Sequence, residues 1–157
     1  MNTIKTLSDA DAAIDLLQQK MMDHPAAICP VVHTFTPGLY ARQITMPAGS
    51  LITSKIHKTE HPFVISQGSV SVWLEGLGWN LLTAPHFGVT LPGTRRVLVV
   101  HEDTVWTTFH PTNLKTVEEI ENEIIEPRYD HLAGMRQPSV EEMLDVLNQT
   151  LHLEGDA

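Results

Sequence analysis

The sequence contains a single cysteine among its 157 residues, and this scarcity excludes two kinds of site. Cys29 alone can form neither an internal disulfide framework nor a thiolate metal cluster. No local pattern of a catalytic nucleophile surrounds it, so we expect a buried and inert thiol.

Basic residues and long apolar runs are also scarce. Ten lysines and arginines stand against nineteen acidic residues, which gives a formal net charge of -9. So few and scattered cations cannot form a face that follows a phosphate backbone, so we expect no nucleic-acid partner. No apolar run reaches the length of a membrane span, and the N-terminus has acidic residues where a signal peptide is apolar. We therefore expect a cytoplasmic protein without a membrane partner.

The middle of the chain carries the signals of a β protein. Between residues 39 and 111, seven or eight short runs of β-forming residues alternate with turns at glycine and proline. Such regular spacing predicts an all-β sandwich or barrel. Residues 1–38 form a lead-in with a predicted helix over 8–23, and residues 112–157 are expected to be mainly helical. We expect one domain overall, with Thr112 or Asn113 capping the first C-terminal helix and Ser139 opening the second with a capping box.

The stretch from Gly49 to Gly68 holds most of the residues that can do chemistry. Its alternation predicts a strand with Lys55 and His57 on one side, followed by a second strand over 61–66. A hairpin of these two strands brings His61 to the same interior. The pattern therefore predicts two imidazoles and one ammonium group in a small shared space.

This stretch resembles the first motif of the cupins, small β-barrels of jelly-roll type. In that motif a glycine is followed by two histidines, a glutamate and a second glycine at fixed spacing. The register closes here without a gap over Gly49, Lys55, His57, His61 and Gly68. The resemblance implies that Lys55, His57 and His61 occupy the family's metal-binding positions, but only His57 keeps the family residue.

The second cupin motif is matched more loosely. Pro92 and Gly93 lack the residue that separates them in the family, and Arg96 stands where the fourth metal ligand is expected. The resemblance covers roughly residues 40–110 and implies a cupin-like jelly-roll barrel with flanking helices. It also implies a homodimer or higher homo-oligomer. The chain is further similar to short cupin-like proteins encoded by tailed bacteriophages, which would place it in a host's cytoplasm.

The substitutions allow two chemical interpretations. Lysine and arginine offer no lone pair at neutral pH, so at most His57 and His61 of the family's metal site survive. A divalent transition metal such as zinc, iron, manganese or nickel then needs a third ligand, for which His110, Glu60 and His101 are the candidates. In the other interpretation the cations themselves bind a phosphate or carboxylate in the barrel. Its residues are Lys55, His57, His61, Arg96, Arg42 and His110.

Three function classes follow. The preferred hypothesis is a binding protein that holds, and so sequesters, a small anionic ligand resembling a phosphate or nucleotide, with Trp73, Trp79 and Trp106 as stacking candidates. The alternatives are a metal-dependent enzyme using His57 and His61, and an interaction protein whose site has degenerated. The remaining residues have simpler interpretations. One of the alternating Arg95 and Arg96 should point outward, and the glutamates within 118–126 form a solvated helix face. We interpret the other histidines as structural: His24, His33, His86, His131 and His152.

Overall fold

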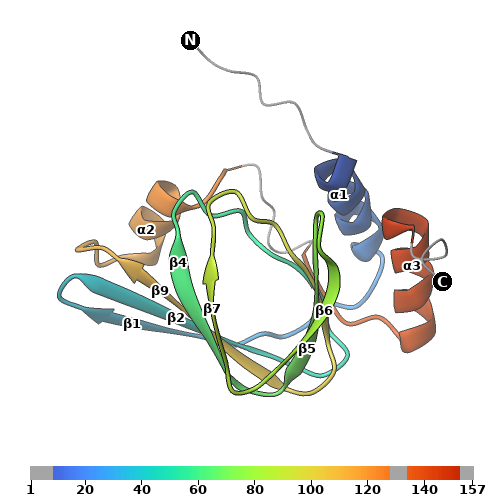
Figure 1. The fold of residues 1–157 in the computed structure, drawn as a ribbon, viewed down its shortest axis with the longest axis horizontal. Coiled ribbons are helices and arrows are strands. Elements are labelled where there is room, and N and C mark those ends of the chain that lie inside the picture. The colour runs from blue at the N-terminus through green and yellow to red at the C-terminus, as the bar shows by residue number, and fades with distance from the viewer. Residues whose placement is uncertain (1–8, 128–133, 153–157) are drawn as a thin grey trace, which may run out of the picture.

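Two antiparallel sheets form the body of the protein (Figure 1). The computed structural model describes residues 9–127 and 134–152. One sheet has the strand order β1-β2-β9-β4-β7, and the other has the order β10-β3-β8-β5-β6. The strands are β1 (Val31–Thr36), β2 (Leu39–Met46), β3 (Leu51–Thr53), β4 (His61–Gln67), β5 (Ser69–Leu74), β6 (Gly78–Thr83), β7 (His86–Thr90), β8 (Val97–Val100), β9 (Thr104–Pro111) and β10 (Met135–Arg136).

The strand pairing is that of a jelly roll. From β2 to β9 the pairs are nested: β2 with β9, β3 with β8, β4 with β7 and β5 with β6. This is one long antiparallel hairpin wound so that successive pairs alternate between the sheets, and the pairs β4·β9 and β5·β8 complete each sheet. The predicted mainly β fold is therefore confirmed, with one qualification of shape: the pairings among the described residues form two facing sheets and no closed barrel.

The hydrophobic core lies between the sheets. Its buried members come from both sheets and include Ile44, Phe63, Ile65, Val70 and Trp106. Fully burying each such side chain contributes roughly 1.5–3 kcal/mol, so this cluster is the main source of stability. Its position also makes the space between the sheets the place where an internal cavity forms.

Helices α1 (Asp9–Met21) and α3 (Val140–Leu151) pack together on the outside of one sheet (Figure 1). Ile14 and Leu17 of α1 and Leu147 of α3 share a buried cluster with Leu51 and Val97 of strands β3 and β8. The predicted capping box is present, because the Ser139 hydroxyl accepts from the backbone of Glu142 and the Glu142 carboxylate accepts from Ser139. The apolar stripes of both helices are thus used against the sheet.

Helix α2 (Val117–Ile124) lies on the other side, next to β4 and β9 (Figure 1). Its N-cap is Thr116, whose hydroxyl accepts from the backbone of Glu119, so the prediction of Thr112 or Asn113 as the cap is wrong. Ile120 and Ile124 pack on Tyr40 of β2. This contact fixes α2 beside the space between the sheets.

The predicted hairpin from Gly49 to Gly68 is wrong. Strand β3 ends at Thr53 and belongs to one sheet, whereas β4 starts at His61 and belongs to the other. Residues 54–60 cross between the sheets, and His57 forms an isolated bridge with Ile125 after α2. The alternation of residues 51–57 resembled a continuing strand, but a jelly roll requires a crossover at this point.

The start of strand β8 determines where the two arginines lie. Strand β8 starts at Val97, which leaves Arg95 and Arg96 in the preceding loop. The segment 112–157, predicted to be mainly helical, also contains the short strand β10 and lies partly outside the described residues.

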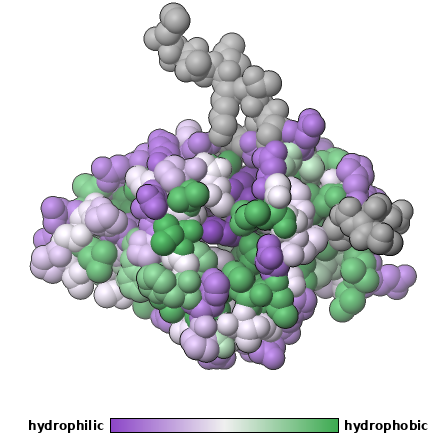
Figure 2. Space-filling view, in the orientation of Figure 1, coloured by the Kyte–Doolittle hydropathy of each residue, from purple (hydrophilic) through white to green (hydrophobic). Residues whose placement is uncertain are grey.

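Figure 2 shows apolar side chains scattered among polar ones on the face that carries β4, β6 and β7. The exposed large apolar residues of the edge strands β6 and β7 are Leu81, Phe87 and Val89. The homo-oligomer implied by the resemblance stays a prediction. Among the described residues, no helix has the length and apolar character needed to cross a membrane.

Candidate metal and anion site

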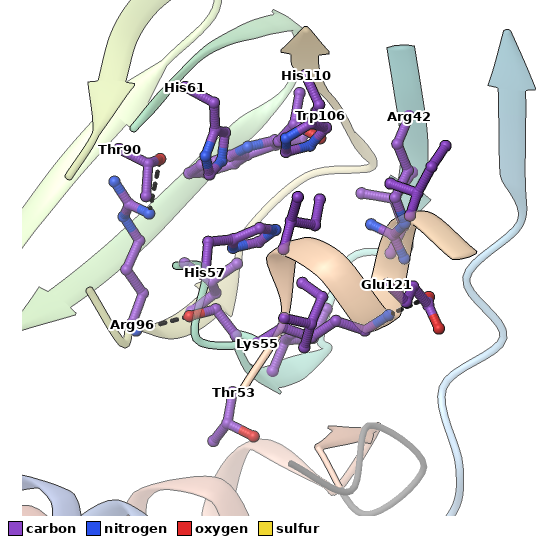
Figure 3. A pocket seen from close by; sticks show the side chains of 18 of the residues that line it. Arg42, Thr53, Lys55, His57, His61, Thr90, Arg96, Trp106, His110 and Glu121 are labelled. Atoms are coloured by element: carbon purple, nitrogen blue, oxygen red, sulfur yellow. Dashed lines mark hydrogen bonds and ion pairs between the residues drawn. The ribbon is translucent and has the colours of Figure 1, made fainter. Parts of the chain in front are cut away.

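A cavity of about 120 Å³ lies between the two sheets and is covered on one side by α2. An apolar wall that includes Ile44, Ile52 and Leu98 surrounds a group of polar side chains. Every candidate binding residue named from the sequence lines this cavity: Arg42, Lys55, His57, His61, Arg96 and His110. Three of them come from strands β2, β4 and β9 of one sheet, two from the crossover at residues 54–60, and Arg96 from the loop before β8 (Figure 3).

Three of these residues form a histidine cluster: His57, His61 and His110. Each offers one ring nitrogen, and these three atoms lie within 4.8 Å of one another. The ring centroids of His61 lie 4.4 Å from those of both His57 and His110. The register that pairs Phe63 with Thr108 places His61 alongside His110 two residues further on. His57 reaches the same point from the crossover.

Burial keeps these imidazoles neutral. It lowers the pKa of His57 to about 2 and that of His110 to about 4, and neighbouring histidines and Arg42 add to both shifts. The pKa of His61 is also lowered, mainly by burial and also by Arg96, against a hydrogen bond to Thr59 that raises it. Neutral imidazoles have lone pairs, so the cluster presents three donor nitrogens at neutral pH.

Hydrogen bonds orient two of the rings. His61 Nδ1 lies 3.0 Å from the carbonyl oxygen of Thr59, which can only accept, so Nδ1 carries the proton and Nε2 has the lone pair. His110 Nε2 lies 2.9 Å from Oγ1 of Thr108, and its Nδ1 is buried with no hydrogen-bond partner within residues 9–127 and 134–152. An unpaired buried nitrogen is costly unless something satisfies it.

Lys55 is engaged by a residue that the sequence analysis assigned to solvent. Its Nζ lies 2.8 Å from Oε1 of Glu121 on α2 (Figure 3). Burial lowers the pKa of Lys55, and the hydrogen bond to Glu121 opposes that shift. The interpretation of the glutamate run as a wholly solvated face is therefore wrong at Glu121, which lines the cavity.

Arg96 is half-buried beside aromatic rings and has no carboxylate partner in the described chain. Its guanidinium carbon lies 5.2 Å from the centroid of Phe63 and 5.8 Å from that of Trp106, and Nη1 donates to Thr90 Oγ1 at 3.1 Å. Burial lowers its pKa to about 10, so it remains charged at neutral pH. A half-buried cation without an acidic partner among the described residues is able to pair with an anion.

Arg95 has the opposite role to its neighbour. It points away from the cavity and pairs with Asp15 at 2.7 Å and Asp11 at 3.6 Å on α1. The prediction that one of the two arginines points away from the cavity is confirmed.

Of the tryptophans and the alternative third ligands named from the sequence, only Trp106 lines the cavity. Trp106 lines the cavity and stacks on Phe63 with centroids 4.5 Å apart, whereas Trp73 and Trp79 pack against the cluster under α1 and α3. Neither alternative third ligand joins the histidine cluster: Glu60 is exposed, and His101 is exposed and hydrogen-bonded to Ser71.

The residues assigned simpler roles also have definite positions. Cys29 is half-buried against the core, and burial raises the pKa of its thiol. His33 is hydrogen-bonded to the Tyr40 hydroxyl, His24 lies 3.6 Å from Glu142, and His152 caps α3. His131 lies outside the described residues.

Sequence reasoning missed Glu121, Thr90 and Tyr40 as cavity residues. The spacing of Thr116 and Glu119 is a helix-capping signature and could have located α2, and hence Glu121 on its inward side. Nothing local in the sequence marks Thr90 or Tyr40, because their roles depend on which strands become neighbours.

The residues fit a metal ion. Three neutral imidazoles with converging nitrogens form a known type of donor set for zinc and related metals, and three protein ligands leave a position open for a small molecule. Arg96 lines the same cavity and cannot coordinate a metal. Its positive charge would attract an anionic ligand to a metal held by the three histidines.

No protein-family model matches this chain, and no curated protein matches it. Several solved structures are similar in fold. KdgF from Halomonas sp. is 23% identical, with a TM-score of 0.45 over 57% of this chain and 83% of that one. An RmlC-like cupin family protein from Methanocaldococcus jannaschii is 11% identical, with a TM-score of 0.45 over 54% and 81%. A cupin-2 domain protein from Shewanella frigidimarina is 12% identical, with a TM-score of 0.43 over 54% and 80%.

The fold agrees with the resemblance of the sequence to the first cupin motif. The nested strand pairs form a two-sheet jelly roll, and the residues matched to the first cupin motif lie on its crossover and on β4, facing the cavity. The chain therefore has a cupin-type fold.

Proposed function

We propose that this protein binds a divalent transition metal ion through His57, His61 and His110 and holds a small anionic ligand beside it through Arg96. One observation carries the proposal: three ring nitrogens from three separate segments lie within 4.8 Å of one another in a cavity. Histidines that only fill a core would satisfy their nitrogens with nearby hydrogen-bonding groups. Here one buried nitrogen, Nδ1 of His110, has no such partner in the described chain.

The sequence favoured binding of an anion alone, whereas the geometry of the cavity favours a metal ion together with an anion. The anion-only hypothesis used the cations Lys55, Arg96 and Arg42, but Lys55 is paired with Glu121. The metal hypothesis lacked a third ligand, and His110 supplies one. Both parts now combine, because a metal and Arg96 can attract the same ligand from two sides.

In this proposal the histidines bind the metal and Arg96 binds the anionic ligand. The histidines remain neutral and oriented by Thr59 and Thr108, so they bind the ion without first losing protons at neutral pH. When bound, the metal supplies Lewis acidity to a ligand oxygen. Arg96 holds an anionic group of the ligand, and the apolar wall excludes water from the rest.

A ligand of this cavity must be small. A volume of about 120 Å³ is comparable to an apolar cavity of about 150 Å³ that accepts benzene. A carboxylate or phosphate group with a few attached carbons fits that space, whereas a whole nucleotide would have to extend beyond it. We therefore favour a small carboxylate or phosphate over the nucleotide-like ligand.

Metal content measured after incubation with zinc or cobalt and removal of free ion tests the proposal. We expect about one ion per chain in the unmodified protein and a large loss in His57→Gln and His110→Gln. The matched control is His101→Gln, which removes an exposed histidine outside the cavity and should retain the ion. Retention of metal by both cavity variants, or its absence from the unmodified protein, would overturn the proposal.

A further inference from the structure

The cavity has two cationic ends with the histidine cluster between them. At one end the Arg96 guanidinium lies beside Thr90, and at the other Arg42 lies near Lys55 and Glu121 (Figure 3). The electrostatic couplings agree with this arrangement: Arg96 acts on His61, whereas Arg42 and Lys55 act on His57.

The charges of the described cavity lining do not balance. Arg42, Lys55 and Arg96 carry three positive charges, and Glu121 supplies the one carboxylate among these lining residues. With neutral histidines and no metal ion bound, a formal charge of +2 remains inside a protein whose net charge is -9. Charges in a low-dielectric space are expensive unless they are paired, so a ligand with two negative charges suits the cavity.

The two arginines are also the members of this set that are free to bind. The Lys55 ammonium is already paired with Glu121. No ion pair engages Arg42 or Arg96 within the described ranges 9–127 and 134–152. Arg42 comes from β2 in one sheet and Arg96 from the loop before β8 in the other, so each is fixed by a different wall.

The space between the arginines suits hydrocarbon. Ile52, Leu98 and Ile124 line the cavity together with the histidine rings. A compact dianion such as phosphate would place both charges at one end and leave the other arginine unpaired. A molecule with two separated anionic groups and a short apolar link can pair with both.

We propose that the natural ligand of this cavity is a short-chain dicarboxylate, with one carboxylate bound by Arg96 and the other by Arg42. This inference rests on the anion-binding part of the proposed function and deepens it by naming the ligand class. The guanidinium group can form paired hydrogen bonds with a carboxylate at each end. Chain length then decides which diacid spans the two arginines.

Isothermal titration calorimetry on the full chain tests the inference, using malonate, succinate and glutarate as probes and acetate and inorganic phosphate as comparators. We expect the best diacid to bind at least about tenfold more tightly than acetate and phosphate, because only it engages both arginines. Affinity that passes through a maximum along the diacid series would support two fixed anchors. Acetate or phosphate binding as tightly as every diacid would overturn the inference.

Variants separate the two ends. Arg42→Gln and Arg96→Gln should each reduce the preference for diacid over acetate to near unity, whereas Lys58→Gln, which removes an exposed cation outside the cavity, should leave it unchanged. A diacid preference that survives Arg42→Gln would contradict binding at two ends. Arg42 and Arg96 are both half-buried, so each variant tests one end of the cavity independently of the other.

The metal measurement keeps the two proposals distinct. Titration of the diacid is performed on both metal-free and zinc-loaded protein, and metal content is measured on the same samples. Bound metal without diacid preference would sink the dicarboxylate inference and leave the metal site intact. Preference for a diacid in a protein that binds no metal would contradict the metal site and leave the dicarboxylate inference intact.

Discussion

The Nζ atom of Lys55 lies 2.8 Å from Oε1 of Glu121, and this ion pair joins the crossover between β3 and β4 to helix α2. The Lys55 side chain is 15% exposed and that of Glu121 is 42% exposed, so the pair lies at the edge of the cavity. Because its charge is paired with Glu121, Lys55 is less available than Arg42 and Arg96 to bind an anionic ligand. The pair also holds α2 over the histidine cluster.

Breaking this pair should loosen α2. We expect Glu121→Gln to lower the free energy of unfolding by about 1–2 kcal/mol, because the mostly buried ammonium of Lys55 loses its charged partner. Urea denaturation measures the change. A double-mutant cycle with Lys55→Met should give a coupling of about 1 kcal/mol; additive single effects would show that the pair contributes nothing.

The adjacent arginines should respond oppositely to substitution. Arg95→Met breaks the contacts with Asp11 and Asp15 and should destabilise the protein by about 2 kcal/mol, between the values for exposed and buried pairs. Arg96→Met removes a half-buried cation that lacks an acidic partner in the described chain, so stability should be unchanged or should rise by about 1 kcal/mol. Thermal unfolding compares the two. Equal destabilisation would contradict the role of Arg96 as an anion receptor maintained at the expense of stability.

Acid should destabilise the metal-free protein through its buried histidines. In the fold the pKa is about 2 for His57 and about 4 for His110, whereas an unfolded histidine titrates near 6.5. Below about pH 6.5 the unfolded chain therefore binds more protons, so stability falls as pH falls and keeps falling toward those folded values. Each histidine contributes up to about 1.4 kcal/mol per pH unit.

Unfolding free energies measured between pH 7 and 5 check this dependence. His110→Gln should have a shallower slope than the unmodified protein, because it lacks one of the titrating groups. A His110→Gln slope equal to that of the unmodified protein would show that His110 does not remain neutral in the fold.

Glycine at position 68 is required by both its backbone and its surroundings. Its φ is +93°, and a Cβ atom there would lie 2.4 Å from the carbonyl oxygen of Asp103. We expect Gly68→Ala to cost about 3 kcal/mol or more, since strain and a backbone clash add. Gly76→Ala is the matched control: φ is +80° but no atom lies within 4 Å, so only about 1 kcal/mol is expected. Equal losses in thermal stability would show that the clash is relieved by a small shift.

The sequence was informative about elements and about the face that each strand buries. The β strands between residues 39 and 111 and the capping box at Ser139 could be predicted, because turn residues and alternation are local properties. The register with the cupin motif placed His57 and His61 together even though the hairpin invoked for it does not exist. The jelly-roll crossover produces the same proximity by another path.

The errors share a physical cause. Lys55 was interpreted as a free cation and Glu121 as a solvated residue, because an ion pair across 66 positions depends on where α2 docks. The choice of His110 over His101 and Glu60 likewise depends on β9 lying next to both β2 and β4. Long-range strand pairing of this kind leaves no mark in local sequence.

The central claim is that the three histidines form a metal centre, and anomalous X-ray diffraction from crystals grown with cobalt tests it most directly. The account predicts a strong anomalous peak within bonding distance, about 2.1 Å, of one ring nitrogen each from His57, His61 and His110. A cobalt-loaded crystal with no peak between these rings, or with its peaks only at surface histidines, would contradict it.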